Sequence, residues 1–386
     1  MQAKLKKCLV ATSLALTGAL PLLAHAGGTI EFGDDKSVTI GFGMEASLSA
    51  KENAANNGKD YSQDASLDSA RIYLSGNVNK YISGMLNYQT TGNYVIDANV
   101  QIKPFDDATI WVGRMLSPSD RANMAGPYYS LGTGWTGNDI TARYSYNGGT
   151  IGRDDGVAVT GTLMDGVLTY GGGIYAGHTA FNLSGLTGST SDINSISGNV
   201  WKTDTTQMKD GFLYAGRLGI DFWDKEGASP YGTGDYRGGA DILAIGLSGK
   251  YQKDGASTTH ANGDYSLYSL DFLLEKKDVG PGAVHVGAAY YKYDTDGAIL
   301  SEQGSAYQAE AAYTFNQKFG WGKLQPFAQY QKFDSDSTTT TERKYDIGLA
   351  YVIDPYNAEI TGKFINDKLE GKSSVNTFML ATQFQF

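Results

Sequence analysis

The clearest alternation of apolar and polar positions lies at the end of the chain. Between Asn376 and Phe386, every second residue falls in a set that includes Phe378, Leu380 and Phe384. The intervening residues are mostly Thr, Ala and Gln. A period of two over eleven residues predicts a β-strand, because successive side chains of a strand point to opposite faces.

The same alternation begins at Val38, Ile40 and Phe42, with polar or small residues between them. It recurs through the chain in segments of about ten residues, the length a tilted strand needs to cross the hydrocarbon layer of a membrane. In lipid an open sheet edge would leave backbone groups unpaired, so such a sheet must close. We therefore predict an all-β fold, a transmembrane antiparallel β-barrel of about 16 strands near 37–49, 66–79, 81–92, 94–104, 108–114, 156–163, 167–176, 211–223, 239–252, 264–276, 283–294, 305–316, 323–334, 342–354, 356–367 and 374–386.

The predicted connections alternate between short and long. Tight ones at 79–80, 164–166 and 354–355 are separated by longer ones such as 50–65, 177–210 and 334–341. Short periplasmic turns and long outer loops give this asymmetry in outer-membrane barrels. Two connections do not follow it: 224–238 is long for a periplasmic turn, and 91–93 is short for an outer loop.

The first 26 residues have the pattern of an export signal. Lysines stand at positions 4, 6 and 7, the run from Cys8 to Leu23 is largely apolar, and residues 24–26 read Ala-His-Ala. Small residues at this spacing mark a cleavage site, so we expect residues 1–26 to be removed. Residues 27–386 contain no composition break and are expected to form one barrel domain in the outer membrane of a Gram-negative bacterium.

Composition agrees with a strand-rich chain and argues against other classes. The chain has 50 Gly and 26 Tyr but only 8 Pro, which favours strands and turns. Its net charge of −10 becomes −13 once the three signal lysines are lost, so no nucleic-acid partner is expected. The single cysteine, Cys8, lies in the signal, so the mature chain has no disulfides.

An enzymatic function finds little support in the sequence. Of the four histidines, His25 falls in the signal, and His178, His260 and His285 have no ligand-spaced partner. A serine–histidine hydrolase would need a positioned pair. We expect a protein that is not an enzyme, with no catalytic, cofactor or metal site, and we assign the acidic stretches 294–297 and 334–336 to solvated turns.

The stretch from Arg114 to Asp155 is predicted to fold inward and narrow the lumen. It carries charged residues that would face the wall, including Asp120, Arg121 and Arg143. Opposed charges across a narrow pore create a transverse field that orients and filters ions. The alternative is a surface loop whose charges are solvated.

Strand parity indicates which charged residues face the lumen. A charge on the lipid face costs about 2–4 kcal/mol near the midplane, so charged positions are assigned to the interior. The inward bases are Arg71, Lys103, Arg217, Lys250 and Lys363, and the inward acids are Glu45, Asp97, Asp221, Asp271, Glu275, Glu310, Asp346 and Glu359. The candidate pore-lining and constriction set is Arg71, Lys103, Arg114, Asp120, Arg121, Arg143, Arg217, Asp97, Asp271 and Glu310. This set predicts a lumen of mixed sign.

Several short motifs occur in order along the chain: Gly113-Arg114 with Ser117-Pro118, the stretch 152–157, Asp165-Gly166 with Tyr170, Gly216-Arg217, Leu324-Gln325-Pro326 and the closing Phe386. In this order the chain resembles the phosphate-selective porin O and P family. That resemblance implies a sixteen-stranded trimeric barrel that attracts phosphate through ladders of arginine and lysine, and Arg71 and Arg217 match inward arginines of the family. Gln329 stands where relatives often carry arginine, and the 114–155 stretch has few bases.

We therefore expect a general or weakly selective porin for passive diffusion of small hydrophilic solutes and ions. Its expected partners are outer-membrane lipid, lipopolysaccharide and two further copies of itself in a homotrimer. The alternatives are an anion- or phosphate-selective porin, a barrel conduit that sheathes an outer-membrane electron-transfer partner, and an adhesin or receptor acting through loop 177–210.

Overall fold

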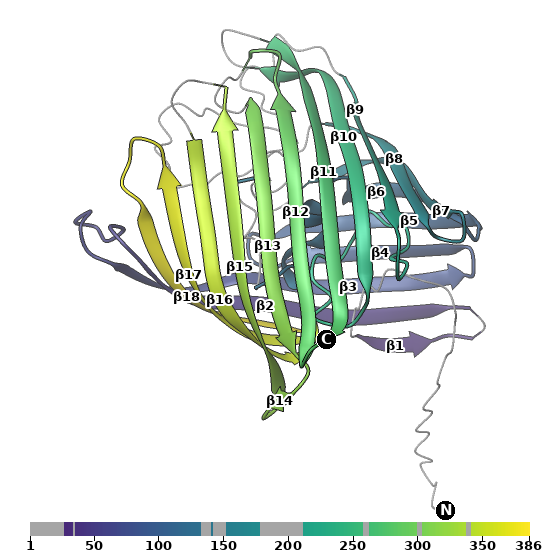
Figure 1. The fold of residues 1–386 in the computed structure, drawn as a ribbon. Helices are drawn as coiled ribbons and strands as arrows, with labels where there is room; N and C mark the ends of the chain where they lie inside the picture. The colour runs from purple at the N-terminus through teal and green to yellow at the C-terminus, as the bar shows by residue number, and fades with distance from the viewer. Residues whose placement is uncertain are drawn as a thin grey trace, which may run out of the picture.

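In the described part of the chain, sixteen long strands form one closed antiparallel barrel (Figure 1). The computed structural model describes residues 27–33, 35–132, 140–141, 152–177, 211–257, 262–298, 303–336 and 341–386. The strands are β2 (Ser37–Lys51), β3 (Ser62–Asn79), β4 (Ile82–Gln89), β5 (Tyr94–Phe105), β6 (Ala108–Leu116), β7 (Arg153–Leu163), β8 (Leu168–Tyr175), β9 (Leu213–Asp221), β10 (Ile242–Ser257), β11 (Asn262–Val279), β12 (Gly282–Asp294), β13 (Gly304–Phe315), β15 (Gly322–Ser335), β16 (Thr341–Asp354), β17 (Ala358–Leu369) and β18 (Val375–Gln385). Each predicted segment overlaps one of them, so the predicted fold class is confirmed.

The barrel closes where the two ends of the sheet meet. β18 pairs with β2 in a continuous antiparallel register. Beyond that register, the Phe42 amide donates to the Phe386 carbonyl at 2.8 Å and the Phe386 amide donates to the Phe42 carbonyl at 2.9 Å. Two short strands add to the ring, β1 (Gly28–Glu31) beside β2 and β14 (Lys318–Phe319) beside β15. Closure leaves no long unpaired edge to face lipid.

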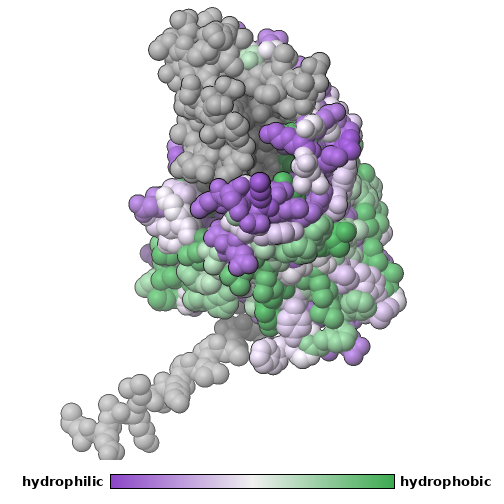
Figure 2. All heavy atoms as spheres, turned by 90° about the vertical axis from the view of Figure 1, so that its left-hand side faces the viewer, coloured by the Kyte–Doolittle hydropathy of each residue, from purple (hydrophilic) through white to green (hydrophobic). Residues whose placement is uncertain are grey.

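The two faces of the barrel differ as period-two patterning requires. Leu247 and Leu270 oppose each other on neighbouring strands, and each is about half exposed on the outside. On the face drawn in Figure 2, hydrophobic residues form a belt across the barrel wall, with hydrophilic residues above it. Exposed aromatic residues flank the belt, with Tyr81, Phe105, Trp223, Phe319, Trp321 and Phe386 at one end and Tyr214, Tyr251, Tyr268, Tyr307, Tyr330 and Tyr345 at the other. Aromatic girdles of this kind suit the two membrane interfaces.

The interior is polar, and most of the connections follow the expected alternation. Buried inward residues include Glu45, Asp97, Lys250 and Gln308. At one end the turns are tight: the turn after β7 uses Met164 and Asp165 in the left-handed region before a glycine with φ of 82°. Within the described chain no helix is long and apolar enough to cross a membrane.

Two connections enter the barrel instead of staying at its rim. After β6 the chain forms the short helix α1 (Arg121–Ala125) and the 3₁₀ turn η1 (Pro127–Tyr129), which are largely buried. We call residues 117–132 the outer segment, because they leave the long-loop end. Between β9 and β10, residues 222–241 leave the short-turn end and also reach buried positions inside the barrel, and we call them the inner segment.

Candidate functional site

The outer segment crosses the lumen because its polar side chains bond to the wall. Asp120 caps α1 by accepting from the Asn123 amide, and it also accepts from the Tyr291 hydroxyl of β12 at 2.8 Å. Farther along, the Tyr128 hydroxyl donates to Ser69 of β3 at 3.1 Å. The segment therefore reaches from the β12 side of the barrel to the β3 side.

Arg71 contributes to the anchor on the β3 side. Its guanidinium lies 5.3 Å from the centre of the Tyr128 ring and donates to Gln89 at 2.8 Å. A cation over an aromatic face is attracted by the ring quadrupole. Arg71 is buried; the bond to Gln89 ties it to wall strand β4, and the Tyr128 contact places it against the outer segment.

The inner segment is fastened to three different parts of the wall. The Tyr231 hydroxyl donates to Asp97 of β5 at 2.8 Å. Gln325 of β15 donates to Asp235 at 2.9 Å. Glu275 of β11 accepts from the Tyr236 amide at 2.9 Å. These contacts stretch the segment across the lumen.

The two segments meet inside the barrel through backbone bonds. The Gly232 amide donates to the Met124 carbonyl at 3.0 Å, and the Gly234 amide donates to the Tyr129 carbonyl at 3.0 Å. A Cβ placed on Gly232 would lie 3.4 Å from the Cβ of Met124, so the two chains are in van der Waals contact there. The lumen is therefore narrowed from both ends by segments that touch each other.

A buried ion pair joins the same two segments. Arg121 donates to both carboxylate oxygens of Glu226, at 2.5 and 2.6 Å. Burial alone would raise the pKa of Glu226, but the Arg121 guanidinium, with the Tyr236 hydroxyl and Arg217, outweighs burial and holds that pKa below its usual value. Burial alone would lower the pKa of Arg121, but Glu226 and Asp271 raise it above its usual range. Both groups are therefore charged, and the pair is a bidentate bridge across the lumen.

Three of the predicted site residues come together around this bridge. Arg217 of β9 makes a bidentate contact with Asp271 of β11, with one N–O distance of 2.9 Å. The Arg121 amide also donates to Asp271 at 3.3 Å. The sequence did not single out Glu226, the fourth member of this group, because it lies in a stretch without strand periodicity.

The other predicted residues occupy different places. Asp97 bonds to Arg153 at 3.1 Å, and Glu310 faces His285 at 3.4 Å, both inside the barrel. Lys103 has its side chain 44% exposed near the short-turn end, 3.9 Å from Asp106, and does not join the narrow region. Arg143 lies outside the described residues, as do most of loop 177–210 and residues 1–26.

The prediction that Arg114 lines the lumen needs correction. β6 continues to Leu116, so Arg114 is still within the strand and shares its outward parity with Val112. It forms a 2.7 Å ion pair with Asp155, its register partner on β7, whose side chain is 57% exposed. Arg114 therefore lies on the outer face, where its partner neutralises it.

The space left in the described part of the lumen is uneven. On the short-turn side a cavity of about 760 Å³ is lined by residues of both segments and the wall, including Tyr170, Arg217, Lys225 and Tyr356. Between Tyr128 and Tyr231, at the level of the contact between the two segments, the pocket is only about 50 Å³. Met124 and Gly232, which make the contact between the segments, also line the larger cavity.

The histidine that falls in a strand has acidic neighbours that sequence spacing did not reveal. The fold places His285 beside Asp235, Glu275 and Glu310. These acids are 50, 10 and 25 positions away along the chain, so no local motif links them. Among the described residues, Asp235, Glu275 and His285 are the group whose ligand atoms lie close enough together to hold a metal ion.

No family model and no curated protein matches the chain. Solved structures do match its fold. An anion-selective porin from Comamonas acidovorans has a TM-score of 0.59 at 12% identity, covering 91% of this chain and 100% of its own. OmpT of Vibrio cholerae, described as outer-membrane expressed, has a TM-score of 0.56 at 13% identity over 92% and 100%. The outer-membrane channel DcaP of Acinetobacter baumannii has a TM-score of 0.56 at 12% identity over 92% and 99%. The chain therefore has the fold of outer-membrane porins.

Proposed function

We propose that the protein is an outer-membrane porin that lets small hydrophilic solutes and ions diffuse passively across the outer membrane of a Gram-negative bacterium. In this proposal residues 1–26 are an export signal, and the protein is not an enzyme. The observation that carries the proposal is a closed barrel with an apolar belt outside, a polar lumen inside and two segments of its own chain that narrow that lumen.

Weak selectivity follows from how the lumen charges are arranged. Three arginines of the narrow region lie beside acids, Arg121 beside Glu226, Arg217 beside Asp271 and Arg153 beside Asp97, whereas Arg71 lies against Gln89 and the Tyr128 ring. An anion trap needs cations whose field is not cancelled by a neighbouring carboxylate. This pairing favours a general pore over the phosphate-selective alternative, although the Comamonas structure of similar fold is called an anion-selective porin.

The contacts of the inner segment argue against a conduit that sheathes an electron-transfer partner. A sheath needs a lumen wide enough to admit another protein, whereas here the chain's own residues, such as Tyr231 and Tyr128, are buried in it. A homotrimer remains part of the proposal, supported by one similar structure of Vibrio cholerae OmpT that is described as a trimer form.

Single-channel recording in a planar lipid bilayer tests the proposal. We expect stepwise conductance from the purified protein and a reversal potential in a salt gradient that shows less than about tenfold preference for either ion sign. A protein that inserts, is strand-rich by circular dichroism and yet gives no conductance steps would contradict the proposal.

A further inference from the structure

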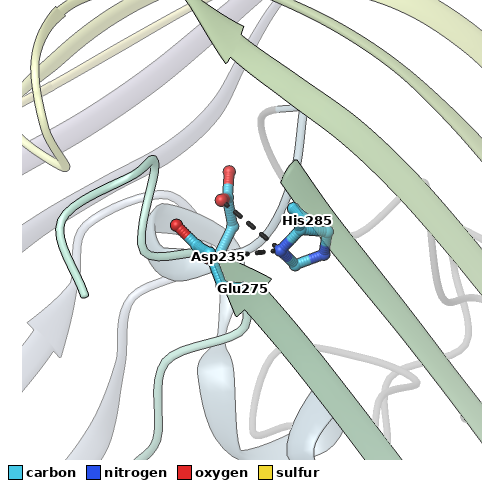
Figure 3. A group of neighbouring side chains, drawn as sticks. All are labelled: Asp235, Glu275 and His285. Atoms are coloured by element: carbon cyan, nitrogen blue, oxygen red, sulfur yellow. Dashed lines mark hydrogen bonds and ion pairs between the residues drawn. The ribbon is translucent and has the colours of Figure 1, made fainter. Parts of the chain in front are cut away.

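Asp235, Glu275 and His285 place three metal-ligating atoms together in the barrel (Figure 3). Glu275 on β11 and His285 on β12 are direct register partners, so both side chains point inward at the same level. Asp235 comes from the inner segment and completes the group from the lumen side. All three are buried, with at most 1% of any of these residues exposed.

The distances fit a small coordination shell. His285 Nδ1 lies 3.3 Å from Glu275 Oε2 and 3.7 Å from Asp235 Oδ1. Each residue offers one atom, and these atoms lie within 4.8 Å of one another. Ligands about 2.0–2.2 Å from a tetrahedral Zn²⁺ stand about 3.3–3.6 Å apart, so small side-chain shifts would bring all three into bonding distance.

The second ring nitrogen of His285, Nε2, has a carboxylate partner that also fits a metal site. His285 Nε2 faces Glu310 Oε1 at 3.4 Å, and Glu310 is itself held by Gln329 at 2.9 Å. A histidine that ligates a metal through one nitrogen usually donates its other N–H to a carboxylate, which fixes the tautomer and the ring orientation. Glu310 stands in that position.

The two carboxylates are held in place before any ion binds. The Arg237 amide donates to Asp235 at 2.9 Å, and the Tyr236 amide donates to Glu275 at 2.9 Å. Each carboxylate oxygen can accept such a bond and still bind a metal, because it has two lone pairs. The ligands therefore lose little side-chain freedom on coordination.

The charge of the surroundings also favours a cation. Asp235, Glu275 and Glu310 face the imidazole, and the nearby Arg237 guanidinium lies 3.8 Å from Asp235 and 2.9 Å from a fourth acid, Glu359, so acids outnumber bases in this group. A proton on Nδ1 can point at only one of the two oxygens that face it, whereas a divalent ion can bind both and the nitrogen together.

We propose that Asp235, Glu275 and His285 form a binding site for one divalent transition-metal ion of the Zn²⁺ type, with Glu310 as the positioning residue behind the histidine. Mixed imidazole and carboxylate ligands suit such ions. The ion fastens the inner segment to the β11–β12 wall. This inference does not depend on the proposed porin function.

Metal titration of the folded full barrel in detergent tests the site. After chelator treatment and dialysis, we expect one equivalent of Zn²⁺ to bind per chain, measured by competition with a chromophoric chelator. Co²⁺ should give the visible absorption of a site with nitrogen and oxygen ligands. A folded barrel that takes up neither ion would overturn the proposal and show that the cluster holds only a proton.

Variants separate the site from general metal uptake. His285→Gln should weaken Zn²⁺ affinity at least about 100-fold, and Glu310→Gln should weaken it about 10- to 100-fold and shift the Co²⁺ spectrum. The matched control is Asp346→Asn, which removes another buried carboxylate of the wall. The D346N variant should bind Zn²⁺ with the same affinity as the unmodified protein. Circular dichroism verifies that each variant is folded. The proposal would be overturned if H285Q bound Zn²⁺ as tightly as the unmodified chain. It would also be overturned if H285Q and D346N lost the same amount of Zn²⁺ affinity.

Discussion

The outer and inner segments reach the same level of the lumen from opposite ends of the barrel, but they are held differently. In the outer segment, Asp120 caps α1 and accepts from the Tyr291 hydroxyl of the wall, and the Tyr128 hydroxyl donates to Ser69 of the wall. The inner segment is held by buried carboxylates, with Asp97 and Glu275 accepting from it. The lumen is therefore narrowed by two segments that are anchored independently to the wall and that contact each other, and not by a single loop.

Shortening the inner segment should have the largest effect. Replacing residues 225–239 with a tight Asn-Gly turn removes the support below the outer segment, so single-channel conductance should rise at least about twofold. The control is to shorten the short-turn hairpin around Lys318 and Phe319, which are exposed, and this should leave conductance unchanged. Unchanged conductance in the first variant would show that the inner segment does not limit flow.

Breaking the ion pair between the segments should have a smaller effect. Glu226→Gln leaves the buried Arg121 with Asp271 and the Thr233 carbonyl as neighbours and without its bidentate acid, which should lower the free energy of unfolding in urea by about 3 kcal/mol. The lumen also loses one negative charge, so the reversal potential in a salt gradient should move toward anion preference. A reversal potential equal to that of the unmodified protein would mean that permeant ions do not pass Glu226.

The same pair predicts a pH dependence. The pKa of Glu226 lies below its ordinary value of 4.5 because Arg121, with Tyr236 and Arg217, outweighs the effect of burial. The Glu226–Arg121 pair therefore contributes its full stabilisation when the pH is above the ordinary pKa of Glu226. This stabilisation is lost as the pH falls through the lowered pKa. We expect the conductance of the unmodified protein to increase as the pH falls below the ordinary pKa of Glu226. In E226Q this increase should be absent, and an increase of the same size there would assign it to other groups.

Arg114→Gln should have the smallest effect. Arg114 lies at the base of the outer segment but on the outer face, paired with Asp155. Partly exposed ion pairs contribute about 0–1 kcal/mol, so unfolding should change by no more than that. The reversal potential should stay the same. A clear shift would show that the Arg114 side chain faces the lumen and contradict its assignment to the outer face.

The wall of the barrel could be predicted from sequence because its signal is local. A lipid-facing strand must show an apolar residue at every second position, as in Leu243, Ile245 and Leu247, whatever the rest of the chain does. That requirement gave all sixteen long strands and the inward orientation of Arg217 and Asp271.

The inner segment could not be predicted in the same way. Its only signal was that 224–238 is too long for a periplasmic turn. Its position depends on partners far away in the chain: Tyr231 and Asp97 are separated by 134 residues. Contacts at that separation leave no periodic pattern, so Glu226, Asp235 and the neighbours of His285 appear only once the barrel is closed.

The contact between the two segments can be measured directly by an engineered disulfide. Met124 and Gly232 are suited to it, since a Cβ on Gly232 would lie 3.4 Å from that of Met124 and disulfide Cβ atoms stand about 3.5–4.5 Å apart. In a barrel without Cys8, the M124C/G232C variant should lose both free thiols on mild oxidation and regain them on reduction. If both thiols stayed free and reactive in the folded, oxidised barrel, the segments would not meet in the lumen.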